Sequence, residues 1–170
     1  PESLSRLTLR CLVDYAAERY SSAPALSWVG QEPISFRELK ESASTLSHWL
    51  SEQGVGFGDA VAILSENSPH WGVAYFGITG MGALAVPILT EFHPDAIQYL
   101  IRHSEAKVVF VSEKLYSKVE DAEFEHNPIF VNLESFQPIE RGATRDMLRE
   151  LKTAGLLQFR KFRETFLRLP

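Results

Sequence analysis

The sequence predicts an α/β fold in which a doubly wound, mostly parallel sheet is flanked by helices. Three observations lead to this prediction. Residues 60–64 and 84–89 are continuous apolar runs, as expected for strands buried on both faces of a sheet. A helix that begins at Pro69 and closes at glycines lies between them, so the three segments form a βαβ unit with parallel strands. Further strands are predicted at 107–112 and 129–133, each after a helical segment, which continues the alternation.

An N-terminal helix and a short β-hairpin are predicted before the sheet. Thr8 is suited to cap a helix over residues 7–20, because its hydroxyl can accept a hydrogen bond from a free first-turn amide. The apolar face of this helix would contain Leu9, Leu12, Val13, Ala16, Ala17 and Tyr20. Two short segments, 25–29 and 33–36, flank turn residues and predict the hairpin.

The second helix carries the clearest local signals. Ser35 and Glu38 have the spacing of a capping box, in which each side chain bonds a backbone amide at the helix start. An apolar stripe follows at alternating steps of three and four residues, at Phe36, Leu39, Ala43, Leu46 and Leu50. Gly54, Gly56 and Gly58 then end the helix and form a loop.

The later helices alternate with the strands of the sheet. Ser68 caps the helix that begins at Pro69, Pro94 begins another, and residues 113–121 form a shorter one. The helix at Pro94 has an apolar face made of Ile97, Leu100 and Ile101. Val86 lies inside an uninterrupted apolar run, so we expect it to be a core residue on a central strand.

Charge divides the chain into two parts. Residues 1–140 contain 9 basic and 19 acidic side chains, a balance of −10, whereas residues 141–170 contain 8 basic and 3 acidic, a balance of +5. We therefore expect an α/β subdomain over 1–140 and a basic amphipathic helical tail over 141–170. The apolar stripe of the tail would contain Leu148, Leu151, Leu156, Phe159, Phe162 and Phe166. Such a helix can bind an acidic membrane surface or a partner, although a solvated face on a helix packed against a domain is the commoner case.

Bulk composition narrows the functional classes. The 170 residues are about the length of one domain, and 45% hydrophobic residues is ordinary for a globular protein. A net charge of −5 argues against nucleic acid as a partner. No apolar run reaches the ~18 residues of a membrane span, and no signal peptide opens the chain. We therefore expect a cytoplasmic protein, with peripheral membrane contact as the alternative, and a buried, inert Cys11.

The residues alone do not form a catalytic constellation. Gly80–Ala85 matches the G-x-G-x-x-A form of a dinucleotide fingerprint, but that motif has to follow a strand and open a helix. Here it closes a helix, so close helix–sheet packing is the better explanation. There is no Gly-Lys-Ser/Thr phosphate loop, and no two histidines have metal-ligand spacing. We predict no catalytic and no metal-binding residue, and interpret His70 as a partly exposed packing residue.

Two loops follow the predicted strands at the edge where open α/β sheets bind ligands. Residues 66–68, Glu-Asn-Ser, follow the first strand, and residues 90–93, Thr-Glu-Phe-His, follow the second. A ligand-binding role is one interpretation of both loops, and ordinary turn and cap chemistry is the other.

Three stretches of the sequence occur in a specific order and spacing. Residues 34–39, Ile-Ser-Phe-Arg-Glu-Leu, are similar to a T/S-Y/F-x-E-L motif. Residues 58–71 are similar to G-D-x-V-A-I-x-x-x-N-x-x-x-W, and residues 81–88, Met-Gly-Ala-Leu-Ala-Val-Pro-Ile, to G-A-x-x-V-P. Over residues 7–135 the chain therefore resembles the N-terminal part of acyl-adenylate-forming (AMP-binding) enzymes, especially fatty-acid–CoA ligases.

The resemblance implies a reaction and its cofactors. Such enzymes use ATP and Mg²⁺ to activate a fatty acid or other carboxylate as an acyl-adenylate, and coenzyme A then takes the acyl group. The family's Ser/Thr/Gly-rich phosphate loop, acidic adenine and ribose site, and adenylating lysine do not occur in these 170 residues. The resemblance therefore implies an N-terminal portion that is inactive and binds no cofactor alone, and that needs the remainder of the ligase as a partner.

The resemblance also implies one set of cofactor-binding residues. In coenzyme A-using relatives, the loop after the V-P strand lies near the thioester-forming tunnel, so Thr90, Glu91 and Phe92 are the residues expected to line it. Some relatives have glycines in this loop, whereas this chain has none there.

Three hypotheses remain open. The first is the N-terminal portion of an ATP-dependent fatty-acid–CoA ligase, the second a non-catalytic α/β interaction module, and the third a truncated nonribosomal peptide synthetase adenylation domain. The coding sequence that follows discriminates among them, because a phosphate loop indicates an enzyme and a carrier domain indicates the third hypothesis. The apolar stripe of the tail also predicts a homodimer.

Overall fold

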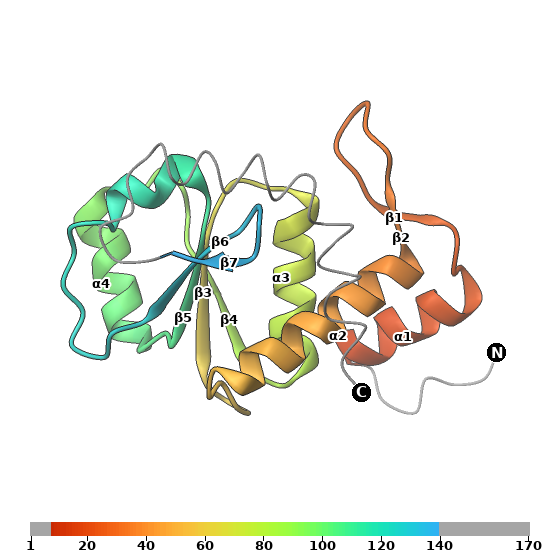
Figure 1. Cartoon of the computed structure of the whole chain (residues 1–170), viewed down its shortest axis with the longest axis horizontal. Helices are drawn as coiled ribbons and strands as arrows, with labels where there is room; N and C mark the ends of the chain where they lie inside the picture. Colours follow the sequence, from red (N-terminus) through yellow and green to blue (C-terminus); the bar gives the residue numbers. More distant parts are fainter. Residues whose placement is uncertain (1–7, 140–170) are drawn as a thin grey trace. The chain divides into compact units, whose positions relative to one another are not determined.

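The computed structural model describes residues 8–139, which form two compact units. The first unit contains residues 8–57 and 67–83, and the second contains residues 58–66 and 84–139. Figure 1 shows the elements of both. The predicted basic tail and its boundary at residue 140 lie outside the described residues.

The first unit consists of helices and a short hairpin. Its elements are α1 (Leu9–Arg19), β1 (Pro24–Leu26), β2 (Ile34–Ser35), α2 (Phe36–Glu52) and α3 (Pro69–Gly80). Each helix begins at its predicted cap. The Thr8 hydroxyl accepts a bond from a first-turn amide at 3.2 Å, and Ser35 and Glu38 form a complete capping box. At the start of α3, the Ser68 hydroxyl accepts from Trp71 N–H at 3.0 Å.

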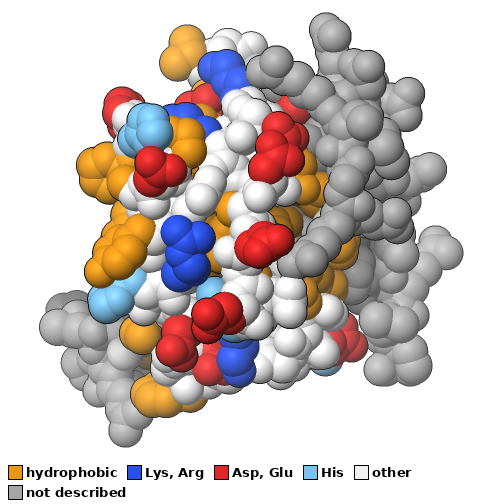
Figure 2. All heavy atoms as spheres, turned by 90° about the vertical axis from the view of Figure 1, so that its left-hand side faces the viewer, with side chains coloured by type: hydrophobic (Ala, Val, Ile, Leu, Met, Phe, Trp, Pro, Cys, Tyr) orange, Lys and Arg blue, Asp and Glu red, His pale blue; other side chains and the backbone are white. Residues whose placement is uncertain are grey.

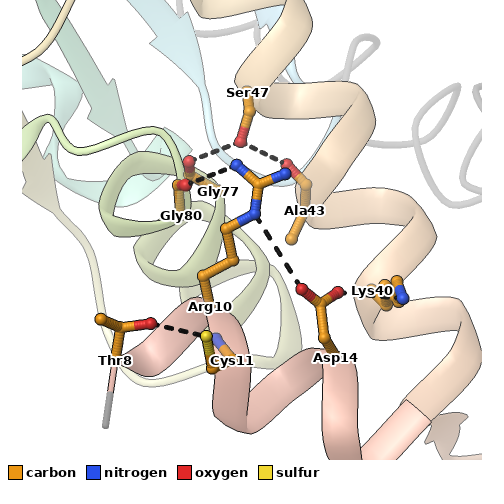
Figure 3. Close-up of polar contacts among 9 residues, drawn as sticks. All are labelled: Thr8, Arg10, Cys11, Asp14, Lys40, Ala43, Ser47, Gly77 and Gly80. Carbon is orange, nitrogen blue, oxygen red and sulfur yellow. Dashed lines mark hydrogen bonds and ion pairs between the residues drawn. The ribbon is translucent and has the colours of Figure 1, made fainter. Parts of the chain in front are cut away.

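Helices α2 and α3 approach closely because small residues lie between them. A Cβ added at Gly77 would lie 3.1 Å from Leu46 Cδ2 and 3.2 Å from the Ala43 carbonyl oxygen, which is tighter than ordinary contact. The Ser47 hydroxyl, 2.9 Å from Ala43 O and 2.6 Å from Gly77 O, bridges the two helices (Figure 3). The predicted stripe of α2 is confirmed for its buried members, Leu39, Ala43, Leu46 and Leu50.

Helix α1 makes polar contacts with both α2 and α3. Arg10 Nη1 donates to Gly80 O at the C-terminus of α3 at 3.3 Å, where the helix dipole favours a cation. Asp14 lies between Arg10 and Lys40, 2.9 Å from the lysine Nζ (Figure 3). A hollow of about 120 Å³ lined by these three residues and their neighbours lies here. Because Asp14 already pairs with both cations, the hollow is not an obvious site for an anion.

The predicted apolar face of α1 is only partly correct. Ala16 and Ala17 are buried, whereas Leu12 is 51% and Tyr20 52% exposed. Cys11, expected to be buried, is only partly buried. The helix therefore packs through its small residues, and its large apolar side chains lie toward the outside.

The second unit contains the predicted sheet. Its elements are β3 (Ala60–Leu64), β4 (Leu84–Pro87), α4 (Pro94–Ser104), β5 (Val108–Val111), the 3₁₀ helix η1 (Glu113–Lys118), β6 (Ile129–Asn132) and β7 (Gln137–Pro138). The strand order is β4-β3-β5-β6-β7, with parallel pairs from β4 to β6 and an antiparallel pair at β7. This confirms the predicted α/β fold with a mostly parallel sheet.

The strand order explains where the core lies. Strand β3 has neighbours on both sides, and Ala62 pairs in register with Val86 of β4 and Val109 of β5. One buried cluster covers this side of the sheet, with α4 and η1 contributing. Its buried members include Ala62, Leu64, Ile88, Ile97, Ile101, Val109, Val111, Leu115, Tyr116 and Val119.

Several strand details differ from the predictions. Strand β4 is an edge strand of the described sheet and ends at Pro87, so Val86 is only partly buried and is not on a central strand. Strand β7 was not predicted, because a two-residue antiparallel strand has too little sequence to show a period.

The glycines of the motif at the end of α3 lie in the first unit. Gly82, at the end of α3, has φ +85°, and an added Cβ would lie 2.6 Å from Phe57 Cδ2. The positive φ explains the glycine at this position. Its near neighbour Phe57 belongs to the loop before β3 and not to the sheet, so close helix–sheet packing of the glycine motif stays a prediction.

Candidate functional site

The strands β3, β4 and β5 present their carboxyl ends at one edge of the sheet, the upper edge in Figure 1. Strand β3 connects to β4 on one side, whereas β5 connects to β6 on the other. The connections therefore diverge between β3 and β5. In open α/β sheets, ligands bind outside the carboxyl ends at such a point.

Glu66 lies at this point and is held by groups that follow β5. Its Oε2 accepts a hydrogen bond from the Ser112 hydroxyl at 2.9 Å, and its Oε1 lies 3.3 Å from Lys114 Nζ. Burial by itself would raise the pKa of Glu66. Hydrogen bonds from its own backbone amide, from Ser112 and from Lys114 outweigh this effect and lower the pKa below its ordinary value. The carboxylate is therefore a fixed anion at neutral pH.

The contact between Ser112 and Glu66 does not form a nucleophile–base pair. Ser112 is only 2% exposed, so a substrate carbonyl could not reach its oxygen. The contact joins the loop after β3 to the loop after β5, which is a structural role.

The predicted cofactor-binding residues lie in the loop between β4 and α4. Thr90 is partly buried, whereas Glu91 and Phe92 are exposed. Lys118, at the end of η1, donates to the backbone oxygens of Thr90 at 2.7 Å and of Phe92 at 2.9 Å. The structure thus brings two of the three predicted residues together through a lysine that sequence reasoning did not single out.

The residues that sequence reasoning missed had no local signal. Ser112, Lys114 and Lys118 are ordinary polar residues of a short helical segment, and their partners are 26 to 48 residues away in sequence. Only knowledge that β5 lies beside β3 would have directed attention to them.

His70, interpreted from the sequence as a partly exposed packing residue, belongs to the first unit. It lies in the first turn of α3 and is partly buried. Burial disfavours the charged imidazole and lowers the pKa of His70 to about 4. The side chain is therefore neutral at pH 7.

Metal-ligand groups, helix hydropathy and surface charge can be described for residues 8–139. Within residues 8–139, no group of three His, Cys, Asp or Glu side chains is placed to hold a metal ion. None of the helices in this range combines the length and the hydropathy that a membrane crossing needs. On the face that carries α4 and η1, acidic and basic side chains are interspersed with hydrophobic ones (Figure 2).

The structure defines an open, mostly parallel α/β sheet whose connections diverge at its carboxyl edge. Comparison with known proteins identifies the family. Residues 13–157 match the family model described as AMP-binding enzyme. The chain therefore belongs to the AMP-binding enzyme family, as its motifs had indicated.

Individual relatives include both peptide synthetases and acyl-CoA ligases. The chain is 30% identical over 112 residues to tyrocidine synthase 3 of Brevibacillus parabrevis, covering 65% of this chain and 2% of the relative. It is 30% identical over 111 residues to the acyl-CoA ligase sidI of Beauveria bassiana (strain ARSEF 2860), covering 64% of this chain and 19% of the relative. The crystal structure of the anthranilate CoA ligase AuaEII with anthranoyl-AMP is similar in fold, with TM-score 0.71 and 23% identity, covering 81% of this chain and 29% of that one.

Proposed function

We propose that this chain is the N-terminal portion of an ATP-dependent fatty-acid–CoA ligase and is inactive alone. The family match over residues 13–157 supports the adenylate-forming part of the proposal, because it covers most of the chain and includes the three motifs in order. The similarity to an acyl-CoA ligase supports free coenzyme A as the acceptor. The matched relatives are much longer than the chain, so other segments would supply the reaction centre.

Among residues 8–139, no three His, Cys, Asp or Glu side chains are grouped so that they could hold a metal ion. The two lysines at the carboxyl edge already have partners, Glu66 for Lys114 and backbone oxygens for Lys118. We therefore place ATP and Mg²⁺ with residues beyond this part of the fold. The role that we propose for the second unit is to support the acceptor tunnel through Thr90, Glu91 and Phe92.

A nonribosomal peptide synthetase adenylation domain is the second candidate. The similarity to tyrocidine synthase 3 favours it, at the same 30% identity as the acyl-CoA ligase. The two candidates share the adenylate-forming step and differ in the acceptor, which is free coenzyme A in one case and a carrier-bound thiol in the other.

The activity test uses the chain and a longer protein. Pyrophosphate exchange with ATP, Mg²⁺ and a panel of fatty acids should show no carboxylate-dependent signal for residues 1–170. The same assay on the chain continued through its following coding sequence should show exchange, and thioester formation with coenzyme A should follow. Exchange by the short chain would contradict our assignment of its inactivity. Acyl transfer only to a carrier protein would favour the synthetase, and a following sequence without a phosphate loop would favour the interaction module.

The basic tail is the region in which we place contacts with partners. We propose that the stripe of Leu156, Phe159, Phe162 and Phe166 mediates a homodimer, and that the protein is cytoplasmic. Deleting residues 143–170 should then shift sedimentation toward a monomer. Binding of the full chain to acidic lipid vesicles, lost in the deletion, would instead indicate peripheral membrane contact.

A further inference from the structure

The loop between β4 and α4 is anchored at both ends by its backbone. Ile88 N–H donates to Ile63 O at 2.9 Å, which continues the pairing of β4 with β3. At the other end, the carbonyl of His93 accepts from Ile97 N–H at 3.1 Å and begins α4. Residues 89–92 lie between these anchors in neither a strand nor a helix.

A single side chain from η1 holds this middle part. Lys118 Nζ lies 2.7 Å from Thr90 O and 2.9 Å from Phe92 O, so one ammonium group joins two carbonyls of the same turn. Hydrogen bonds with an ionised donor are stronger than those between neutral groups. The backbone oxygen of Lys118 in turn accepts from Gln98 Nε2 of α4 at 3.0 Å. Lys118 is therefore bonded to the loop through its side chain and to α4 through its backbone oxygen.

The apolar core fixes the position from which Lys118 reaches the loop. Leu115, Tyr116 and Val119 of the η1 segment are at most 9% exposed and belong to the same buried cluster as Ile97 of α4. Because residues before and after Lys118 in the sequence are packed in the core, its side chain starts from a fixed position and can hold the neighbouring loop in one geometry.

The contact of Lys118 with the backbone of residues 89–92, which we call the clamp, leaves the side chains of this loop to other partners. Lys118 bonds two of the backbone oxygens, those of Thr90 and Phe92, so we take the exposed side chains as the groups offered to a ligand. Leu89 is 61% and Phe92 38% exposed, although the backbone beneath them is held. Exposed apolar side chains on a fixed backbone suit the aliphatic segments of a long, flexible ligand, because the loop loses little conformational entropy on binding.

We infer that Lys118 is a positioning residue that sets the shape of residues 89–92 for recognition of the acceptor thiol. The acceptor part of this inference rests on the proposed function, with a pantetheine-type thiol as the ligand class. The clamp itself rests only on the contacts of the second unit.

Hydrogen exchange on the 170-residue chain tests the clamp. The amide of Phe92, bonded to Leu89 O at 3.3 Å, reports on the loop, and the amide of Ile88 reports on the adjoining sheet. In Lys118→Met the Phe92 amide should exchange about tenfold faster while that of Ile88 stays unchanged, because only the local opening becomes easier. Lys118→Arg should restore much of the protection, and Lys114→Met, on the same short helix, should leave it unchanged. Equal Phe92 exchange in Lys118→Met and the native chain would overturn the inference.

Kinetics of the longer protein test the acceptor role. Lys118→Met should raise the KM for coenzyme A several-fold, and more than it alters carboxylate-dependent pyrophosphate exchange. A loosened loop with an unchanged KM would overturn the acceptor part. Absence of exchange in the native longer protein would instead count against the proposed function, and the hydrogen-exchange result would still decide whether Lys118 holds the loop.

Discussion

Strands β3 and β4 are both short apolar runs and lie side by side in parallel, but their surroundings differ. Residues 61–64 of β3 are 0% exposed, whereas Leu84 of β4 is 57% exposed and Val86 is only partly buried. Strand β3 pairs with β4 and β5, while β4 pairs only with β3 within the described sheet. The comparison shows that the place of a strand in the sheet, and not its hydrophobicity, decides how much of it is buried.

The carboxyl ends of these two strands are also stabilised differently. After β3, the carboxylate of Glu66 is bonded by side chains that follow β5. After β4, the backbone of the loop is bonded by Lys118. The first arrangement joins the ends of neighbouring strands, and the second shapes one loop. This difference makes the β4 loop the better candidate for contact with a ligand.

The largest effect should come from a charge in the central strand. Ala62→Asp would place a carboxylate at a position that is 0% exposed, between its register partners Val86 and Val109. An unpaired buried charge of this kind should cost roughly 4 kcal/mol or more of the free energy of unfolding. Far-UV circular dichroism and urea titration at pH 7 would measure the loss. A stable, native-like variant would show that β3 is not central.

Lowering the pH should have the next largest effect on the free energy of unfolding, through His70 of α3, the helix between β3 and β4 in the sequence. The pKa of His70 is about 4 in the folded chain and near 6.5 when unfolded, so the unfolded state binds the proton first. The contribution to stability is present above pH 6.5 and is lost as pH falls toward 4, by at most about 3 kcal/mol. Urea titrations at several pH values across this range give the free energy of unfolding. As the pH falls, this free energy should decrease less steeply in His70→Gln than in the native chain. The matched variant His103→Gln, at an exposed position, should keep the native slope.

The same charge at the edge strand should cost less than in the centre. Val86→Asp changes a partly buried residue that packs against the same cluster as Ala62, and the carboxylate can remain in contact with water. We expect a loss of roughly 2 kcal/mol in the free energy of unfolding, less than for Ala62→Asp. Equal losses in the two variants would contradict the difference between centre and edge.

The smallest effect is expected at the most exposed position of β4. Leu84→Thr replaces a side chain that is 57% exposed with one that still favours a strand. The free energy of unfolding should change by about 0.5 kcal/mol or less. A larger loss would show that another part of the protein covers Leu84 in solution, which sedimentation at several concentrations would reveal if that part is a second copy.

Local signals in the sequence predicted the helices accurately. The caps at Thr8, Ser35 and Ser68 were each correct, because a cap depends on a side chain and an amide only three residues apart. The apolar runs located β3, β4, β5 and β6 to within two residues at each end. The family motifs agreed with these elements, since they consist mainly of a capped helix, a strand and a glycine junction.

Predictions that required a distant neighbour were less accurate. Leu12 and Tyr20 have helical spacing with Ala16, but only Ala16 and Ala17 are buried in this helix. Val86 was assigned to the centre because an apolar run does not reveal which strands lie beside it. The three loop residues were named from the family resemblance alone, and their role remains a proposal.

By itself, the sequence determined the three capped helices α1 to α3, the strands β3 to β6, their parallel alternation and membership of the AMP-binding enzyme family, because these depend on short spacings along the chain. Tertiary structure alone decided that β3 lies between β4 and β5, that Glu66 meets Ser112, and that Lys118 holds the loop at Thr90. The physical reason is that a hydrogen bond or a buried contact needs two partners. When the partners are tens of residues apart, only the folded chain shows which ones meet.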